Sequence, residues 1–428
     1  MPIKPSHILG MNSRYHYTKM NPRSARAYGF SKLKTKKLLQ ENNIPTAELY
    51  HVFEHFSDLN HVNWENLPCP FVLKPASGSA GKGVLVITKK IPNKLLWLDN
   101  EKRQMSKEDL DLHVRNILDG EFSTWGNQHI ALVEEMVISH PTLGKLAYSG
   151  TPDLRIIVFN SVPIMAEARI PTHESDGKAN LDKGAIGLGI DMATGITTYG
   201  LKGKKEYITH FPQSKKKVNG ILIPHWPEAM LMAVQAANAA GYMFMGADLF
   251  IHETKGPMIV ELNGFPGLSI QLANRAGLKR RIERVEGIEV RNAEHGVRIA
   301  RALFAEHFVD KFRAEKGLSI ISNMPLITVR GEKKQKKKVL SLVNTSRSRS
   351  AISRELAEEL GLLNFEDLLW QQQEAVEGKV PVVEVEFELK GELIRTAMKA
   401  LSRLNRKKYK VELGREDIKQ FLIGEIEE

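Results

Sequence analysis

Apolar residues along the first three quarters of the chain follow two spacings. Short apolar runs, several of them closed by proline, glycine or asparagine, predict β-strands. The predicted strands are residues 70–75, 84–88, 130–137, 154–159, 162–170, 245–252 and 257–263. Asn160 and Ser161 separate two of these runs and predict the tight turn of a hairpin.

Other segments repeat apolar residues at helical spacing. Leu33, Leu38 and Leu39 form one apolar side of a short helix over residues 31–42. Ser31 is placed to cap that helix, and Pro45 ends it. Further helices are predicted over residues 104–119, 227–240 and 291–312. The mixture of helices and strands predicts an α+β fold.

The pattern breaks near residues 323–325, Asn-Met-Pro, and a second region follows. Residues 331–338, a run of lysines beside one glutamate, are expected to form a solvated turn. Beyond it we predict strands over 339–344, 380–390 and 392–398 and a helix over 353–360. Three parts are therefore expected, a basic segment with the first helix over 1–44, a main domain over 45–325 and a small β-rich domain over 326–428.

Composition excludes several classes of protein. Of the 428 residues, 42% are hydrophobic and 26% charged, which is typical of a folded globular chain. Eighteen consecutive apolar residues do not occur, and the basic start lacks the apolar stretch of a secretory signal. The single cysteine, Cys69, excludes an internal disulfide framework and a multi-cysteine zinc site. We expect a cytoplasmic protein with no membrane span.

The net charge of +11 is concentrated at one end. Residues 1–40 hold nine lysines and arginines and no acid, whereas residues 41–326 are neutral. A protein that binds nucleic acid over its whole surface is therefore not indicated, and no nucleic-acid partner is expected. A local basic segment suits phosphates or an acidic substrate, although a solvated arm would carry the same charges.

Lys74 ends a predicted strand and is followed by a loop rich in glycine and serine. Glycines let backbone N–H groups approach phosphate oxygens closely, and the lysine adds a positive charge. The loop residues of interest are Ser77, Gly78, Ser79, Gly81 and Gly83. The loop fits neither the P-loop pattern nor the dinucleotide fingerprint, because a strand rather than a helix follows it. A plain hairpin loop remains an alternative.

Two further sets of polar residues lie on the predicted strands. Asp248, Glu261 and Asn263 come from neighbouring strands, and the last two are two residues apart and share a face. Three oxygen ligands arranged in this way suit Mg²⁺. Asp153 and Arg155 share a face of another strand, with Arg169 at the end of its hairpin partner. A surface salt bridge is the plainer interpretation of that second set.

Together these motifs resemble the ATP-grasp superfamily, and within it the alpha-L-glutamate ligase-like proteins related to ribosomal-protein glutamate ligases and D-alanine–D-alanine ligases. The resemblance covers residues 7–310 and is most specific over residues 260–268, Val-Glu-Leu-Asn-Gly-Phe-Pro-Gly-Leu. Ser31 replaces an aspartate usual in the family. Residues 12–26 stand where most members carry an N-terminal domain, so the acceptor site is the least transferable part.

The resemblance implies a role for each matched residue. Nucleotide contacts fall on the two lysines, the glycine-rich loop, the segment that meets adenine and the residue that contacts ribose: Lys32, Lys74, Ser77, Gly78, Ser79, Gly81, Gly83, Glu134, Glu135, Val137 and Asp153. Phosphate- or substrate-contacting catalytic residues are Arg155, Arg169 and Asn180, the last in a glycine-containing loop over residues 177–189. The metal ligands are Asp248, Glu261 and Asn263.

The implied activity is that of an ATP-dependent carboxylate–amine ligase. ATP phosphorylates a carboxylate, an amine attacks the resulting acyl phosphate, and the cofactors are ATP and Mg²⁺ or Mn²⁺. The expected partners are an amino-acid or peptide carboxylate and an amine acceptor, with glutamate a family expectation. A non-catalytic ATP-binding regulator or a peptide-binding scaffold is the alternative, and homo-oligomerisation stays open.

The C-terminal region carries a second resemblance, to the retropepsin-like domain called an ATP-dependent zinc protease. Residues 343–346 read Val-Asn-Thr-Ser, where that family reads Val-Asp-Thr-Gly, and residues 411–417 match its ending. Asn344 thus stands at the position of the catalytic aspartate, and Ser346 at that of the glycine. Because an amide is not a general base, the resemblance implies a non-catalytic relative. Asn344 as an ordinary turn residue is the alternative.

Overall fold

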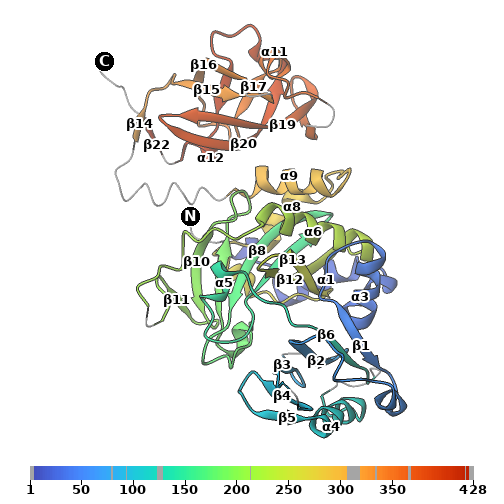
Figure 1. Cartoon of the computed structure of the whole chain (residues 1–428). Helices are drawn as coiled ribbons and strands as arrows, with labels where there is room; N and C mark the ends of the chain where they lie inside the picture. Colours follow the sequence, from blue (N-terminus) through green and yellow to red (C-terminus); the bar gives the residue numbers. More distant parts are fainter. Residues whose placement is uncertain are drawn as a thin grey trace. The chain divides into compact units, whose positions relative to one another are not determined.

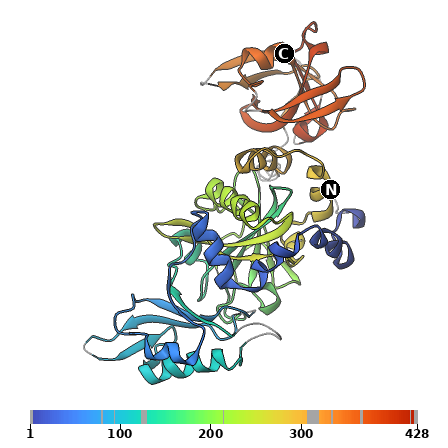
Figure 2. The ribbon, with the colours of Figure 1, turned by 90° about the vertical axis from the view of Figure 1, so that its right-hand side faces the viewer.

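The structure is a computed structural model that describes residues 4–78, 81–92, 94–122, 129–212, 214–305, 319–332, 335–364, 368–419 and 421–423. Contacts divide the chain into two compact units, shown from two sides in Figures 1 and 2. Unit 1 comprises residues 1–190 and 195–282, and unit 2 comprises residues 191–194 and 283–428. The three-part division predicted from the sequence stays a prediction. No helix in the described ranges is long and apolar enough to cross a membrane.

A six-stranded antiparallel sheet forms one lobe of unit 1. Its strands, in spatial order, are β1 (Leu49–Phe53), β6 (Ala131–Glu135), β2 (Phe71–Pro75), β3 (Leu85–Lys90), β4 (Leu96–Asp99) and β5 (Gln104–Ser106). Helix α4 (Lys107–Leu118) packs on the sheet and buries an apolar core around Trp64 and Trp97. Strand β2 thereby holds Lys74 at its end, next to β6.

A seven-stranded antiparallel sheet forms the other lobe of unit 1. Its spatial order is β11 (Glu206–Ile208), β10 (Thr197–Lys202), β9 (Ile186–Ile190), β8 (Val162–Ile170), β7 (Asp153–Phe159), β12 (Phe244–His252) and β13 (Gly256–Asn263). Helix α6 (Trp226–Ala240) packs on β7, β8, β12 and β13, and α7 (Ile270–Asn274) packs on β8, β9 and β10. The sheet carries Asp153, Arg155, Arg169 and Asp248 on inner strands and Glu261 and Asn263 on its edge strand β13.

Shorter helices complete the chain before residue 290. They are α1 (Met11–Lys19), α2 (Arg23–Arg26), α3 (Lys32–Glu41), α5 (Pro141–Gly144) and α8 (Leu278–Val285), with 3₁₀ turns at Pro5–His7, Tyr28–Phe30, Phe56–Asn60 and Leu181–Lys183. The predicted helix start is confirmed, because the backbone N–H of Lys34 donates to Ser31 Oγ at 3.3 Å. Asn21 holds the N-terminal segment to β12, donating to the carbonyl of Phe244 at 2.7 Å and accepting from its N–H.

Unit 2 is built around a β-barrel. Its strands run in the order β15 (Leu326–Arg330), β16 (Lys336–Val343), β21 (Val411–Leu413), β17 (Ala351–Ser353), β20 (Glu392–Leu401), β19 (Gly378–Leu389) and β18 (Leu368–Glu374). Strand β15 pairs with both β16 and β19, and this second pairing closes the sheet. Its interior is a continuous apolar cluster. The remaining elements are α9 (Ala293–Leu303), α11 (Arg354–Glu359), α12 (Arg415–Ile418), a 3₁₀ turn at Ser402–Leu404, and the parallel pair β14 (Ser319–Ile321) and β22 (Phe421–Ile423).

Two predicted helices have other limits in the structure. Residues 104–106 pair with β4 as a strand, and Ser106 then caps α4, so that helix starts at Lys107. The helix predicted over 291–312 starts at Ala293 because the Asn292 side chain caps it, and it ends at Leu303. Residues 306–312 lie outside the described residues. The predicted hairpin is confirmed, since Asn160 and Ser161 both have positive φ angles between β7 and β8.

Candidate functional site

One row of charged residues crosses four neighbouring strands of the seven-stranded sheet. Glu261 on β13 is paired in register with Asp248 on β12, and Asp248 with Arg155 on β7. Arg155 is in turn paired with Glu167 on β8. Directly opposed residues on adjacent strands point to the same face, so the four side chains form a line across the sheet.

Two arginines and two aspartates are joined by buried ion pairs in and beside this row. Arg155 binds Asp248 through two contacts, Nε to Oδ1 at 2.7 Å and Nη2 to Oδ2 at 2.6 Å. Arg169 binds both oxygens of Asp153, at 2.6 and 2.5 Å, and also reaches Asp248 Oδ2 at 2.8 Å. Bidentate pairs of this kind fix orientation as well as charge. Both oxygens of Asp248 are therefore engaged.

Burial and charge act in opposite directions on these acids. Burial raises the pKa of Asp153 to about 6, against the charge of Arg169. Burial also acts to raise the pKa of Asp248. The charges of Arg155 and Arg169 outweigh this effect and hold the pKa of Asp248 below its ordinary value. Asp248 is thus the more firmly ionised of the two aspartates, because two guanidinium groups contact it.

Glu261 and Asn263 lie on the same face of β13, at the edge of the sheet next to Asp248. The Asn263 side-chain oxygen accepts from the N–H of Phe265 at 2.9 Å. Two carboxylates in register and an amide oxygen fit Mg²⁺, which prefers a few oxygen ligands together with phosphate. In the described part of the chain, however, no group of three or more His, Cys, Asp or Glu side chains is arranged to hold a metal.

A second cluster lies on the six-stranded sheet. Glu134 on β6 forms ion pairs with Lys74 on β2 and with Lys36 on α3, the latter at 2.8 Å, and all three side chains are buried. Lys36 also donates to the carbonyl of Ala47 at 2.6 Å. Burial acts to raise the pKa of Glu134, but Lys74 and Lys36 outweigh it and lower that pKa. The cluster holds Lys74 in a fixed place beside the glycine-rich loop.

Lys32, at the start of α3, connects that helix to the glycine-rich loop. Its Nζ donates to the carbonyl of Gly78 at 3.2 Å, and its backbone N–H donates to the carbonyl of Ala76. Burial lowers the pKa of Lys32, and the carboxylate of Glu261 is the largest opposing influence. Lys32 thus lies between the two sheets, within electrostatic reach of the charged row.

The glycine-rich loop needs its glycines for two separate reasons. Gly81 and Gly83 have φ angles of +69°, in the left-handed region that side chains disfavour. A Cβ on Gly83 would also lie 2.5 Å from the ring of Phe122. Ser77 is buried at the start of the loop, while Ser79 lies outside the described residues.

The strand β6 and the segment after it border a cavity between the two sheets of unit 1. The predicted adenine-contacting residues divide here, because Glu134 turns toward the lysines whereas Glu135 forms an ion pair with Lys255. The cavity is lined by Lys36, Ala47, Lys74, Glu134, Val137, Phe250, Met258, Ile259 and Val260. Its walls are mostly apolar, and its charged lining consists of the two lysines and the glutamate of the cluster on the six-stranded sheet.

Among the described residues we find no contact between Asn180 and the charged row. Its side-chain oxygen accepts from the N–H of Asp182 at 2.9 Å and caps the turn at Leu181–Lys183. In the same loop, the side chain of Lys178 lies near Gly81, since a Cβ there would be 3.6 Å from Lys178 Cε. This loop therefore borders the glycine-rich loop.

Two residues of these clusters, Lys36 and Glu167, were not predicted from the sequence. Lys36 follows Lys32 by four residues, so helical spacing places both on one side of α3 and could have indicated it. Glu167 carried no such signal, because its position beside Arg155 depends on the register of β7 and β8.

Residues 10–287 match the family described as sugar-transfer associated ATP-grasp. The chain belongs to this ATP-grasp family. The matched region includes the charged row, the lysine cluster and the glycine-rich loop, so these features belong to the ATP-grasp part of the chain. The barrel lies beyond the match. No curated protein matches the sequence.

Three solved ligases are similar to the ATP-grasp chain at low identity. They are PsnB with its minimal precursor, the VanG D-Ala:D-Ser ligase from Enterococcus faecalis and the D-alanine–D-alanine ligase from Bacillus anthracis with ATP, at 12, 14 and 12% identity. The matches cover 61, 66 and 69% of this chain and 60, 64 and 71% of theirs, with TM-scores of 0.33, 0.34 and 0.34. The chain thus spans about three-fifths of the length of the first. At these scores the likeness adds nothing to the family assignment.

The second predicted site lies in the barrel, where Asn344 follows β16. Its side-chain oxygen accepts from Ser346 Oγ at 2.5 Å and from the Ser346 N–H at 3.2 Å, so it is turned back on its own loop. Its backbone N–H donates to the carbonyl of Leu413 at 2.9 Å. The arrangement places an amide, rather than a carboxylate, at the end of β16.

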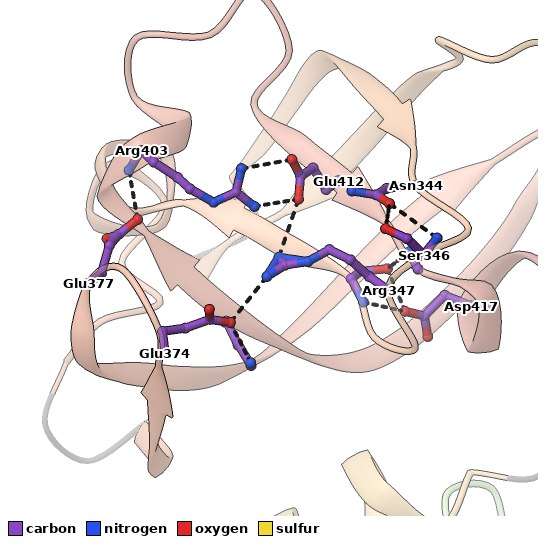
Figure 3. Close-up of polar contacts among 11 residues, drawn as sticks. Asn344, Ser346, Arg347, Glu374, Glu377, Arg403, Glu412 and Asp417 are labelled. Carbon is purple, nitrogen blue, oxygen red and sulfur yellow. Dashed lines mark hydrogen bonds and ion pairs between the residues drawn. The ribbon is translucent and has the colours of Figure 1, made fainter.

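An ion-pair network lies beside this loop (Figure 3). Glu412 on β21 is buried and binds Arg403 at 3.0 and 2.6 Å and Arg347 at 3.2 Å. Arg347 also reaches Glu374 at the end of β18, at 3.1 Å. Glu377, at the turn before β19, accepts the backbone N–H groups of Ser402 and Arg403. The network ties the hairpin of β18 and β19 to β21 and to the loop after β16.

Proposed function

We propose that this chain is an ATP-dependent carboxylate–amine ligase. The observation that carries the proposal is the row of Glu261, Asp248 and Arg155 on one sheet. Lys32 lies within electrostatic reach of Glu261 and donates to Gly78 in the glycine-rich loop. Buried carboxylates and guanidinium groups beside a lysine-bearing loop are what binding and transfer of a phosphoryl group require. The family match supports the proposal at the level of an ATP-grasp protein.

Each part of the site has a proposed role. Lys74, Lys32 and the backbone of the glycine-rich loop bind the nucleotide phosphates, and Val137 borders the adenine. Asp153 contacts the ribose, although it is engaged here by Arg169. Glu261 and Asn263, with Asp248, would hold Mg²⁺ or Mn²⁺, which when bound neutralises phosphate charge.

The proposed reaction has two steps. A carboxylate oxygen of the donor attacks the γ-phosphorus of ATP, and ADP leaves with the bridging oxygen. The amine then attacks the acyl carbon, inorganic phosphate leaves, and the amine loses a proton. Arg155 and Arg169 orient the donor carboxylate and stabilise the charge on the transferred phosphoryl group. Asn180 is proposed to contact substrate from its loop.

The substrates are proposed from the resemblance of the motifs. An amino acid such as glutamate is the proposed donor or addition unit, and a peptide or protein amine is the acceptor. The family description associates the match with sugar transfer, so amines carried on sugars belong among the acceptors to be tested. The barrel is proposed to be a non-catalytic relative of retropepsin-like domains, supported by the amide of Asn344.

The test measures ATP consumption by the purified chain with Mg²⁺ against an array of amino acids, short peptides and amino sugars. We expect ADP release that depends on an amino acid, together with a product heavier by one residue. Lys74→Ala should abolish both signals, whereas Lys89→Ala, an exposed lysine of the adjacent strand β3, should leave them unchanged. ATP binding without turnover would favour the regulator instead, and an absence of ATP binding would contradict the proposal.

A further inference from the structure

Glu167 on β8 is a buried carboxylate. Only 1% of the residue is exposed, and neither side-chain oxygen has a hydrogen-bond partner among the described residues. A Cβ on Gly187 of β9 would lie 3.3 Å from Glu167 Oε2, so the glycine leaves space beside the carboxylate on the neighbouring strand. An ionised carboxylate is expensive to bury unpaired, and an acid kept in such a place calls for an explanation.

The register of the sheet places Arg155 between two carboxylates. Asp248 is its partner on β12, and Glu167 is its partner on β8. Side chains opposed in this way have Cβ atoms roughly 5 Å apart, well within the reach of an arginine on either side. Arg155 is bound to Asp248 by two contacts, and in the described part of the chain the Glu167 oxygens accept no hydrogen bond.

The same ion pairs obstruct the proposed metal site. Asp248 is the register partner of Glu261, but its two oxygens are held by Arg155 and Arg169. A divalent cation beside Glu261 and Asn263 would compete with guanidinium groups for Asp248. Arg169 has Asp153 as a second partner, which already holds it through two contacts. Arg155 has no other partner among the described residues, so it needs a new one if it releases Asp248.

We propose that Glu167 is a positioning residue that receives the Arg155 guanidinium when a divalent cation binds Asp248 and Glu261. The exchange replaces one buried carboxylate–guanidinium pair with another, so Arg155 is never left without a counter-charge. Asp248 gains the freedom to coordinate the cation, and Arg155 stays within the charged row. This inference rests on the proposed function, because it concerns the metal and nucleotide site of that reaction.

The test measures metal affinity separately from nucleotide affinity. Mn²⁺ binding is followed by electron paramagnetic resonance at saturating non-hydrolysable ATP analogue, and analogue binding without metal is followed by calorimetry. Glu167→Gln preserves shape but lacks the charge that holds a guanidinium. We expect its Mn²⁺ affinity to fall at least tenfold while its metal-free analogue affinity stays within threefold. Glu228→Gln, an exposed acid on α6, should change neither.

The same measurement in a chain that already carries Arg155→Gln distinguishes a positioning role of Glu167 from a general structural effect of its substitution. With Arg155→Gln there is no guanidinium to receive, so adding Glu167→Gln should change Mn²⁺ affinity by less than threefold. Wild-type Mn²⁺ affinity in Glu167→Gln, or a tenfold loss that persists with Arg155→Gln, would overturn the inference. In either case the proposed function would not be contradicted if the wild type still binds the ATP analogue. Failure of the wild type to bind the analogue would overturn both.

Discussion

Glu134 offers the sharpest stability test, because it is the only carboxylate that pairs with Lys36 and Lys74 in the described residues. Glu134→Gln keeps the shape of the side chain and removes its charge. Breaking a buried ion pair by removing one partner costs about 3–5 kcal/mol. Lys36 keeps its bonds to the Ala47 carbonyl and to Thr46 Oγ1, so we expect the lower end, about 3 kcal/mol.

Urea unfolding followed by tryptophan fluorescence measures this loss, since Trp64 and Trp97 lie in the core of the same sheet. Glu108→Gln, an exposed acid on α4, is the control and should shift stability by less than about 0.5 kcal/mol. The pKa of Glu134 is lowered in the folded chain, so its stabilisation is present at neutral pH and is lost as pH falls below the ordinary glutamate range. The difference between variant and wild type should therefore shrink in acid. A loss under 1 kcal/mol at pH 7 would refute this reasoning.

Three further predictions concern other parts of the chain. Glu412→Gln should destabilise unit 2 by about 3 kcal/mol in calorimetry, because Glu412 is buried and pairs with two arginines. The control, Arg354→Gln, breaks an exposed pair with Glu358 and should cost under about 1 kcal/mol. Burial raises the pKa of Glu167 to about 7, so the folded chain binds its proton more tightly than the unfolded chain, and this contribution to stability should fall by up to about 3 kcal/mol as pH rises from about 4.5 to 7. Between pH 5 and 8 the unfolding free energy should therefore fall less in Glu167→Gln than in the wild type, while Asp153, whose pKa burial also raises, contributes to the fall in both. Gly83→Ala should weaken ATP binding in calorimetry at least fivefold, because its φ is positive and its Cβ meets Phe122, and unchanged affinity would contradict the role of the loop.

Local features of the fold were predictable because neighbouring residues determine them. Ser31 caps α3 through an N–H three residues away, and Asn160 and Ser161 adopt the positive φ angles of a two-residue turn. The placement of Glu261 and Asn263 on one face follows from the alternation of a strand. Such signals lie within a few residues of one another and can be recognised along the chain.

The partners of those residues could not be predicted, because they come from distant segments. Arg155 and Asp248 are 93 residues apart and meet only because β7 and β12 are neighbours in the sheet. The burial of Glu134 between Lys36 and Lys74 likewise depends on α3 lying beside β6 and on the pairing of β6 with β2. Closure of the barrel requires β15 to pair with β19, some sixty residues away.

The central claim is that a substrate carboxylate is phosphorylated by ATP. Oxygen-18 in the carboxyl groups of a pooled amino-acid mixture tests it, with mass spectrometry of the inorganic phosphate that the chain releases from ATP. We predict one oxygen-18 atom in each phosphate released, because the carboxylate oxygen stays on phosphorus when the amine displaces it. ADP formed with unlabelled phosphate would mean that water, and not a carboxylate, attacks ATP, and would contradict the account.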